Sequence, residues 1–477
     1  MRKGGITVFL TAMLFIFTTF VLACVEAVRF YAVGVEAECA VSMGLDSIFA
    51  EYHRGLLERY DLFFIDSSYG AEQPSYHNTE AHLWNYIAAN LSAVDVPVWN
   101  GKDFLDMRLE GVSIAQASLA TDDCGRDVKY QAVSYMRERV GIGVIEEIQS
   151  QMEIVRGNGL DVRDVEQEAA EVQAKIDGTP LPEQQLEDGS FVTASVDNPA
   201  DSVNGGRFRG ILYLVAEQEE LSDRAINPDN YVSYRTLNTG TGAACGDAAF
   251  LLTDEVLFGE YLIDKCGNYQ NPATDGELQY ELEYILAGKS SDIENLRWVA
   301  GRLILLREAA NVIYLYSDST KVAEANVMAW GLAIVSLEPR LQPLIKDSIL
   351  LAWAYAESVL DVRRLFSGER VPLLKSRETW HLSLDHMLDY VTHLGETEDM
   401  QEGPDYEGYL RLLLLLEKED TKTMRFMDVI EMNMRKLEGN ASFRMDGCID
   451  AVCAEVSISG GFGEYFNLAA QYSYLNR

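Results

Sequence analysis

The first pattern along the chain is an uninterrupted apolar run. From Gly4 to Val25 the only ionisable side chain is the thiol of Cys24. As a helix, these 22 residues would be about 33 Å long at about 1.5 Å per residue, and the hydrocarbon core of a bilayer is about 30 Å thick. The run therefore predicts a membrane-spanning helix that contacts lipid through residues 6–25.

Two other interpretations of this run stay open. A cleavable secretory signal has an apolar core of about 7–15 residues before a small-x-small site, whereas this core is longer and its nearest site, VEA at 25–27, has Glu in the middle. A lipoprotein leader would end at Cys24, because VLAC at 21–24 fits a loose lipobox. Lipid-anchored chains usually continue in a polar tether, and none follows Cys24, so the pattern favours an uncleaved anchor.

Beyond the run, apolar residues recur three or four positions apart, which is the spacing of one helical face. They are Phe30, Val33, Ala37, Val41, Leu45, Ile48, Tyr52 and Leu56. The pattern predicts that a membrane anchor at residues 1–28 continues without a break into an amphipathic stalk helix at 29–60. The stalk would pack either against other membrane helices or against the chain's own head, in both cases through Val33, Val41, Leu45, Ile48 and Tyr52.

The periodicity then changes several times. Strand and helix signals alternate over residues 61–140, as in an α+β segment. Apolar residues repeat at heptad spacing at 145–155 and 162–176, with GNG between them, which predicts a self-packed helical hairpin at 141–177. Residues 178–210, which are rich in Pro, Gly, Asp and Ser, are the best linker candidate.

The last two segments have different periods. Stretches such as SILLAWAYAESVLDVRRLF are apolar on most faces, as helices buried in a bundle are, and predict a helix-rich body at 211–439. Apolar and polar residues alternate on both sides of SGGFGE, which predicts a β-hairpin at 440–477. The predicted fold class is α+β: an N-terminal transmembrane helix and stalk, then a predominantly helical ectodomain with small antiparallel β-sheets.

Charge narrows the choice of partners. The 477 residues include 75 Asp and Glu against 39 Lys and Arg, which gives a formal net charge of −36. Such a chain repels nucleic acid, whose binding requires clustered Lys and Arg, and it does not favour lying flat on anionic lipid. Arg2 and Lys3 precede the apolar run, so the positive-inside rule predicts a cytoplasmic N-terminus and a C-terminal ectodomain outside.

The seven cysteines do not form a disulfide pattern. There is no CxxC, and Cys245 and Cys266 flank a predicted helix that would hold them apart. Cys448 and Cys453 lie on one predicted strand with their side chains on opposite faces. We expect buried, free thiols.

One motif resembles the end of a phosphate-binding loop. GKS at 288–290 follows a predicted strand at 278–286 and precedes a helix that Ser291 and Glu294 would cap. A phosphate-binding loop needs Gly at position 283, and this chain has Glu there. We therefore expect a structural corner without a nucleotide.

A histidine-rich stretch is the candidate for metal chemistry. If WHLSLDHMLDYVTHLG is helical, His386, Asp389 and His393 fall on one face, with His381 nearby. The spacing is not a recognised metal signature, so a cluster at the surface or core edge is favoured over a metal site. The sequence leads us to assign no catalytic residue, no metal ligand and no cofactor.

A second candidate is a pair of carboxylates on one predicted helix. Glu357 and Asp361 lie one turn apart, where two like charges would perturb each other's protonation. We expect them to pair with Arg363 or Arg364, or to face solvent.

Five stretches resemble an uncharacterised family of bacterial single-pass membrane proteins, a domain of unknown function. They are RKGGITVFLTAML, LDSIFAEYHRGLLERYDLFFID, YELEYILAGKSSDIENLRWVAGRLILLREAANVIYLYSD, ILLAWAYAESVLDVRRLF and DYEGYLRLLLLLEKED. At its N-terminus this family is similar to the TadE/TadG-like pseudopilins of the tight-adherence pilus. The resemblance implies an extracytoplasmic protein of a pilus or secretion system, with no established catalytic residues to carry over.

Position 10 departs from the pilin pattern. A prepilin leader ends in Gly, for which Gly5 would serve, and has Glu five residues after the cut, where this chain has Leu10. In pilins that carboxylate is thought to meet a neighbouring subunit's amino terminus, because a lone carboxylate in lipid is costly. Processing at Gly5, lipidation at Cys24 and filament assembly therefore stay open.

Together these patterns predict a membrane-anchored extracytoplasmic structural or assembly component of a tight-adherence-type pilus or a related surface apparatus. Its partners would be the lipid bilayer, through residues 6–25, and other membrane or pilus-system proteins, through the stalk, but not nucleic acid. It would be a single-pass protein of the cell membrane. The alternatives are an anchored lipoprotein-like binding module and a metal-dependent surface enzyme.

Overall fold

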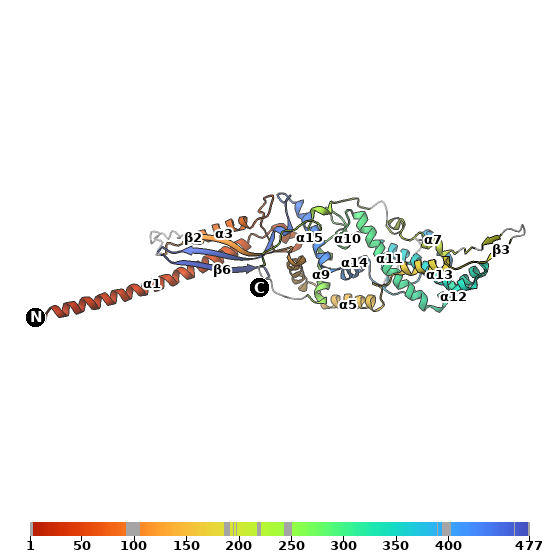
Figure 1. The fold of residues 1–477 in the computed structure, drawn as a ribbon, viewed down its shortest axis with the longest axis horizontal. Coiled ribbons are helices and arrows are strands. Elements are labelled where there is room, and N and C mark those ends of the chain that lie inside the picture. Colours follow the sequence, from red (N-terminus) through yellow and green to blue (C-terminus); the bar gives the residue numbers. More distant parts are fainter. Residues whose placement is uncertain are drawn as a thin grey trace. The chain divides into compact units, whose positions relative to one another are not determined.

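Figure 1 shows the fold of the chain in a computed structural model. The structure describes residues 3–91, 105–185, 191–193, 195–196, 198–216, 221–242, 250–388, 390–393, 402–461 and 463–475, with only the main chain at 3–4, 184–185, 191–193 and 392–393. Contacts divide the chain into two compact units. Unit 1 comprises residues 1–135, 234–249 and 430–477, and unit 2 comprises 136–233 and 250–429. Each unit is thus built from separated stretches of chain, whereas the predicted segments are contiguous.

Unit 1 begins with α1 (Lys3–Phe49), a single helix of 47 residues. The predicted continuation of the apolar run into a stalk is confirmed, since no break separates them (Figure 1). The predicted end of the stalk at residue 60 is wrong. The chain leaves the helix after Phe49, and a second helix, α2 (Arg54–Tyr60), begins where the ring of His53 accepts a hydrogen bond from the N–H of Leu56.

The stalk half of α1 packs within unit 1. Val33, Val41, Leu45 and Ile48 are at most 2% exposed, and we call these four residues the stalk stripe. This stretch of helix contacts α3 (Tyr76–Leu91) and β6 (Tyr465–Ser473). Tyr52, just past the helix, is half-buried against the ring of Phe63. Of the two alternatives that the spacing leaves open, the structure therefore has the stalk packed on the chain's own head.

The sheet of unit 1 is antiparallel and has β5 (Cys448–Ser459) at its centre. β5 pairs with β2 (Arg108–Leu119), with β6 and with the short β1 (Ile65–Asp66). The pairing of β5 with β6 confirms the predicted C-terminal hairpin. The buried, even-numbered residues of β5 from Val452 to Ile458 belong to the same apolar cluster as the stalk stripe of α1.

Helices make up most of unit 2. Its longest are α11 (Asp292–Ser317) and α13 (Gln342–Phe366), which pack against each other and bury 16 and 20 residues, respectively (Figure 1). The remaining α-helices are α4 (Arg126–Arg137), α5 (Ile142–Gly157), α6 (Val165–Asp177), α7 (Ala200–Asn204), α8 (Ile211–Val215), α9 (Leu252–Lys265), α10 (Glu281–Ala287), α12 (Ser319–Val335), α14 (Tyr406–Leu416) and α15 (Glu419–Arg435), of which α4 belongs to unit 1 up to Tyr135 and α15 belongs to unit 1 from Ile430. Among the described residues, the 3-10 helices are Asp122–Cys124 and Met445–Gly447 in unit 1 and Pro228–Asn230, Pro339–Leu341, Leu384–His386 and Tyr390–His393 in unit 2.

The heptad pattern correctly predicts two helices, α5 and α6, but not their partners. α6 packs chiefly against α13 and α11, and α5 against α9 and α14. A self-packed hairpin is therefore wrong. The apolar stripes are short, and the larger apolar surfaces of the bundle bury them instead.

The segment predicted as a linker contains regular structure. β3 (Glu183–Gln185) pairs with β4 (Phe191–Thr193), and α7 packs against α13. Ala200 and Val203 of α7 are buried, so this part of the chain contributes to the core of unit 2.

The predicted strand at 278–286 is wrong, because most of it forms α10. All seven residues of α10 are buried, so the alternation of Leu and Tyr with Glu does not mark two faces of a strand. The side chains of Glu281 and Glu283 instead accept hydrogen bonds from the N–H groups of Gly267 and Tyr269, both at 2.9 Å.

Candidate functional site

A cluster of buried charges lies at the C-terminal half of α13. Lys375, from the loop that follows this helix, donates from Nζ to Glu357 at 2.7 Å and to Asp361 at 2.6 Å. Its third hydrogen bond, at 2.9 Å, goes to the carbonyl oxygen of Thr379. The side chains of Lys375, Glu357 and Asp361 are at most 1% exposed. We call these three residues the Lys375 cluster.

Arg307 of α11 extends the cluster. Its Nε donates to Asp361 at 3.1 Å, and its Nη1 donates to the carbonyl oxygens of Pro372 and Leu373 at 2.8 Å each. The guanidinium is therefore bonded both to α13 and to the loop that carries Lys375. Two cations and two carboxylates therefore balance each other, and none of the four side chains is more than 1% exposed.

His381 contacts the Lys375 cluster through Glu357. One of its ring nitrogens lies 2.7 Å from Nη1 of Arg364, and the other lies 3.4 Å from Glu357. Burial opposes the ionisation of Glu357, but Lys375 and His381 outweigh it and hold the pKa of this carboxyl far below its usual range. Glu357 is therefore ionised and cannot act as an acid near neutral pH.

The Lys375 cluster is built to fix a loop in place. Both oxygens of Glu357 accept hydrogen bonds, including one at 2.9 Å from the N–H of Leu382, and so do both oxygens of Asp361. No oxygen is left over for a substrate. The expected pairing of the two carboxylates with Arg363 or Arg364 is wrong, because Lys375 and Arg307 are their cationic partners.

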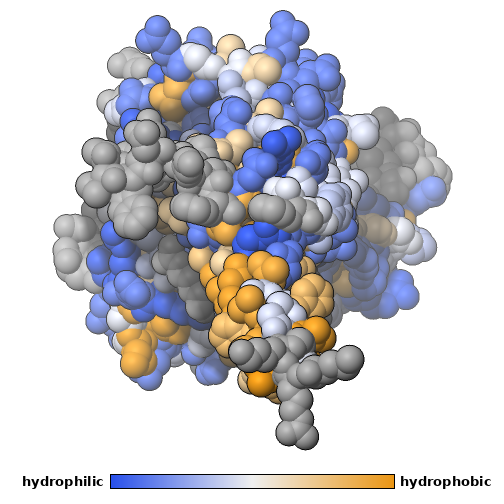
Figure 2. All heavy atoms as spheres, turned by 90° about the vertical axis from the view of Figure 1, so that its left-hand side faces the viewer, coloured by the Kyte–Doolittle hydropathy of each residue, from blue (hydrophilic) through white to orange (hydrophobic). Residues whose placement is uncertain are grey.

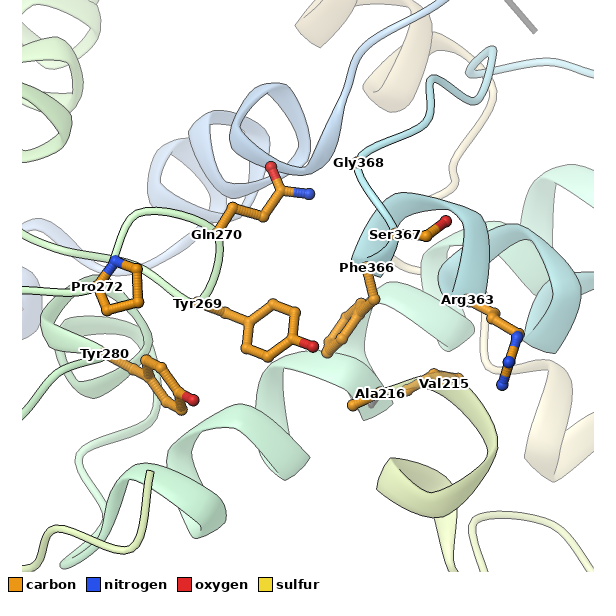
Figure 3. Close-up of a pocket in the computed structure, with 10 residues that line it drawn as sticks. All are labelled: Val215, Ala216, Tyr269, Gln270, Pro272, Tyr280, Arg363, Phe366, Ser367 and Gly368. Atoms are coloured by element: carbon orange, nitrogen blue, oxygen red, sulfur yellow. The ribbon is translucent and has the colours of Figure 1, made fainter. Parts of the chain in front are cut away.

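A cavity of about 500 Å³ lies elsewhere in unit 2 (Figure 3). The rings of Tyr269 and Phe366, 5.0 Å apart between centroids, face each other near its middle, and Tyr280 lies to one side. Gln270, Arg363 and Ser367 supply polar groups. This volume and lining are typical of small-molecule pockets. The described lining residues include no carboxylate, imidazole or thiol, so these residues offer ring stacking and hydrogen bonds for binding a ligand, and none of them transfers protons near neutral pH.

A buried carboxyl group supports the aromatic wall of this cavity. Glu283 accepts hydrogen bonds from the hydroxyl of Tyr406 at 2.6 Å and from the N–H of Tyr269 at 2.9 Å. Burial raises the pKa of Glu283 to about 7, against the effect of these hydrogen bonds. Its Oε2 is buried and has no hydrogen-bond partner among the described residues. The sequence gives no sign of this group, because Glu283 there resembles the polar face of a strand.

The histidine-rich stretch does not form the expected helical face. The structure has two short 3-10 helices there, Leu384–His386 and Tyr390–His393. Residues spaced i, i+3 and i+7 therefore do not share one face of a continuous α-helix. Asp389 and the side chain of His393 lie outside the described residues. His381 contacts Glu357 and Arg364 instead. Among the described residues, no group of three or more His, Cys, Asp and Glu side chains could hold a metal ion.

The GKS motif forms a corner between two helices, not between a strand and a helix. Gly288 ends α10 with a φ of 64°, in the left-handed region that favours glycine. Ser291 caps α11 by accepting from the N–H of Glu294 at 3.3 Å, as predicted.

The thiols are less buried than expected. Cys266 and Cys448 are buried, and Cys453 is half-buried, but Cys24, Cys39 and Cys124 are exposed. No disulfide joins any two of these six cysteines, and Cys245 lies outside the described residues. Cys24 is exposed because it lies in the half of α1 that no other described part of unit 1 covers, and Cys39 is exposed because it lies off the buried stripe of the stalk half.

Comparison with known proteins bears on the family but not on the activity. Residues 191–460 match the model of a family of unknown function, DUF5702. The match includes the Lys375 cluster, the aromatic cavity and β5. Neither the comparison with curated proteins nor the comparison with solved structures found a match. Because the matched region is more than half of the 477 residues, the chain belongs to this family of unknown function.

Proposed function

We propose that the chain is a membrane-anchored extracytoplasmic structural component that serves in the assembly of a tight-adherence-type pilus or a related surface apparatus. The observation that carries this proposal is the division of α1. Its first half exposes large apolar side chains, from Ile6 to Tyr31, while its second half buries one apolar face in unit 1. A long helix that is apolar at one end and packed on an antiparallel sheet at the other has the general shape of a pilin-like subunit.

The exposed half of α1 suits lipid and not water. Ile6, Phe15 and Phe20 are each at least 65% exposed, and Figure 2, in which the left-hand side of Figure 1 faces the viewer, shows apolar (orange) atoms gathered in one group in its lower part. α1 is the one helix of the described residues that is long and apolar enough to cross a membrane. Soluble monomers rarely leave so large an apolar surface in water.

The polar side chains in this stretch are also compatible with lipid. The hydroxyls of Thr11, Thr18 and Thr19 donate to carbonyl oxygens four residues earlier, at 2.9 to 3.0 Å. Such hydrogen bonds within the helix leave no donor unsatisfied in hydrocarbon. Arg2 and Lys3 precede the apolar run, so the positive-inside rule supports an orientation with both units outside the cytoplasm.

The exposed half of α1 is also the surface that remains for neighbouring membrane helices. Val33, Val41, Leu45 and Ile48 are occupied by the head of the same chain. Lateral contacts with other pilus-system proteins would therefore involve residues 6–31 rather than the stalk stripe.

Anchoring is tested by charges in the middle of the exposed half. Each Arg at a helix centre costs about 2.5–3.5 kcal/mol of insertion free energy. Phe15→Arg combined with Ile16→Arg should move the full chain from carbonate-washed membranes to the soluble fraction. Met43→Arg, at a position 53% exposed on the stalk half, should stay with the membranes. A wild-type chain that is soluble after gentle lysis, or a C-terminus shielded from protease added to wall-stripped cells, contradicts the proposal.

Mass spectrometry of the mature N-terminus separates the alternatives. A chain that begins at Met1 or Arg2 supports the uncleaved anchor, one that begins at Ile6 indicates prepilin processing, and lipid on Cys24 indicates the lipoprotein-like module. For the role in assembly, a photo-crosslinking residue at Phe17, which is 64% exposed, should capture a second single-pass helix in cells. Adducts with lipid alone contradict assembly but leave the anchor intact.

A further inference from the structure

One end of the sheet in unit 1 is fixed to α1 just beyond the apolar run. Arg29 forms an ion pair with Glu464, the residue before β6, and a second one with Glu26 at 3.1 Å. The side chains of Arg29 and Glu464 are only 14% and 7% exposed. This pair joins two points that are 435 residues apart in sequence.

Aromatic rings also hold the start of β6 against α1 at this position along the helix. The rings of Phe30 and Phe466 lie 5.2 Å apart between centroids. One turn further along α1, Gly34 leaves room for the ring of Phe466, since a Cβ added there would lie 3.3 Å from it. We call residues 464–466 and the turn of α1 at 29–31 the sheet tip.

The length of the apolar run gives the depth of the sheet tip, provided that α1 is the proposed anchor. If residues 6–25 fill the hydrocarbon core, residues 26–30 extend about 8 Å beyond it, at about 1.5 Å per residue. The headgroup layer is about 5–8 Å thick on each side of the bilayer. The sheet tip therefore lies within the headgroup layer or at its outer limit, and not on a stalk above the membrane.

The exposed side chains at this level suit a membrane–water interface. Tyr31 is 74% exposed and Tyr465 is 59% exposed, and tyrosine combines an apolar ring with a polar hydroxyl. Along β6 the exposed positions are Tyr465, Asn467, Ala469 and Gln471, so the aromatic ring occurs only at the end nearest the apolar run. Arg29 pairs with both Glu26 and Glu464 and so offsets one of the two negative charges at this level, which weakens one reason for this acidic chain to avoid headgroups.

We propose that the sheet tip is a second membrane contact, in which the rings of Tyr31 and Tyr465 insert among phospholipid headgroups. Their hydroxyls donate hydrogen bonds to phosphate or ester oxygens while their rings contact the first carbon atoms of the acyl chains. Unit 1 is then held to the bilayer at two places, and the direction of the sheet relative to the membrane is fixed.

The test places one photo-crosslinking residue, benzoylphenylalanine, at Phe15, Tyr465 or Gln471 of the full chain in phosphatidylcholine vesicles. Gln471 is on the same exposed face as Tyr465 but about 20 Å further along β6, at about 3.4 Å per residue. Lipid adducts, measured by mass spectrometry, should form at positions 15 and 465, with at least a tenfold lower yield at 471.

The three positions separate failure of the tip from failure of the anchor. Adducts at 15 but not at 465, equal yields at 465 and 471, or a protein adduct at 465 instead of a lipid adduct would overturn the second contact and leave the anchor standing. No lipid adduct at position 15 would overturn both. A matched pair of chains, Tyr465→Ser and Asn467→Ser, gives an independent readout: only the former should raise hydrogen exchange in the β5–β6 turn on vesicles without raising it in detergent.

Discussion

α1 and α13 are both long and mostly apolar, yet they place their charges in opposite ways. In the stalk half of α1, Glu36, Glu38 and Asp46 are exposed, and the buried stripe contains only apolar or small residues. In α13, Glu357 and Asp361 are buried, together with Arg364, and every residue of the C-terminal half except the half-buried Arg363 is buried. A helix with a free face can expose its carboxylates, whereas an enclosed helix must find a cation for each one.

The two helices are therefore stabilised by different interactions. The stalk half of α1 is stabilised by burial of apolar area against the sheet, which tolerates modest changes of volume. The core around α13 also depends on compensated charge, where the loss of one partner leaves an ion in a medium that cannot solvate it. We therefore expect substitutions to lower the free energy of opening most in unit 2 and least in the stalk stripe.

The largest effect should come from Lys375→Met. The variant leaves Glu357 buried without its ammonium partner, which costs about 3–5 kcal/mol. Hydrogen exchange of α13 peptides in the detergent-solubilised full chain should show the free energy of opening reduced by that amount. Lys346→Met, which removes a lysine from the accessible start of the same helix, should change it by less than about 0.5 kcal/mol.

A double variant tests whether charge, rather than lost packing, causes the effect. Lys375→Met with Glu357→Gln removes one cation and one anion but keeps the oxygen that accepts from the N–H of Leu382. Asp361 retains Arg307. Protection of α13 should recover by about 1–2 kcal/mol relative to the single variant. No recovery would mean that the cluster does not differ from an ordinary packed core.

Sequence patterns identify the two helices but not the cluster. The unbroken apolar run and its three-four spacing predict α1 and its buried stripe, because one-sided burial produces a period that sequence displays. In α13 the same reasoning gives a buried helix but says nothing of which cation meets Glu357. Lys375 lies in an irregular loop, where no period connects it with the helix, and only the fold brings the two together.

Two further errors have the same origin. Residues 278–286 alternate like a strand, but α10 is buried on all sides, so the alternation reflects the hydrogen bonds of Glu281 and Glu283 and not two sheet faces. The stalk pattern continues through Tyr52 and Leu56, although α1 ends at Phe49. The apolar spacing continues past the end of α1 because Leu56, which belongs to the separate helix α2, is itself a buried residue.

The next largest effect is a dependence on pH in α10. The pKa of Glu283 is raised by burial to about 7 from an ordinary value of 4.5, so between these values the folded chain holds a proton that the unfolded chain has lost. The contribution of protonated Glu283 to the free energy of unfolding is fully present below about pH 4.5 and falls by about 3 kcal/mol as the pH rises to about 7.

Glu283→Gln should remove this part of the pH profile. Protection of α10 peptides in the variant should match the wild type near pH 4.5 and exceed it by up to about 3 kcal/mol at pH 7.5. Glu294→Gln, at an exposed position of α11, should keep the wild-type profile. A Glu283→Gln profile parallel to the wild type would show that this carboxyl group titrates normally and that burial does not govern it.

The smallest effect is expected in the stalk stripe. Ile48 is 1% exposed and packs in the apolar cluster of unit 1, so Ile48→Val removes one buried methylene group and should cost about 0.5–1.5 kcal/mol. Val35→Ala, at a position 43% exposed on the other side of α1, should change the free energy of opening by less than about 0.5 kcal/mol. Both are measured by hydrogen exchange of the 33–49 peptides in the full chain. Equal losses at the two positions would mean that the stalk packs on both sides, and the contrast between a one-sided α1 and an enclosed α13 would then fail.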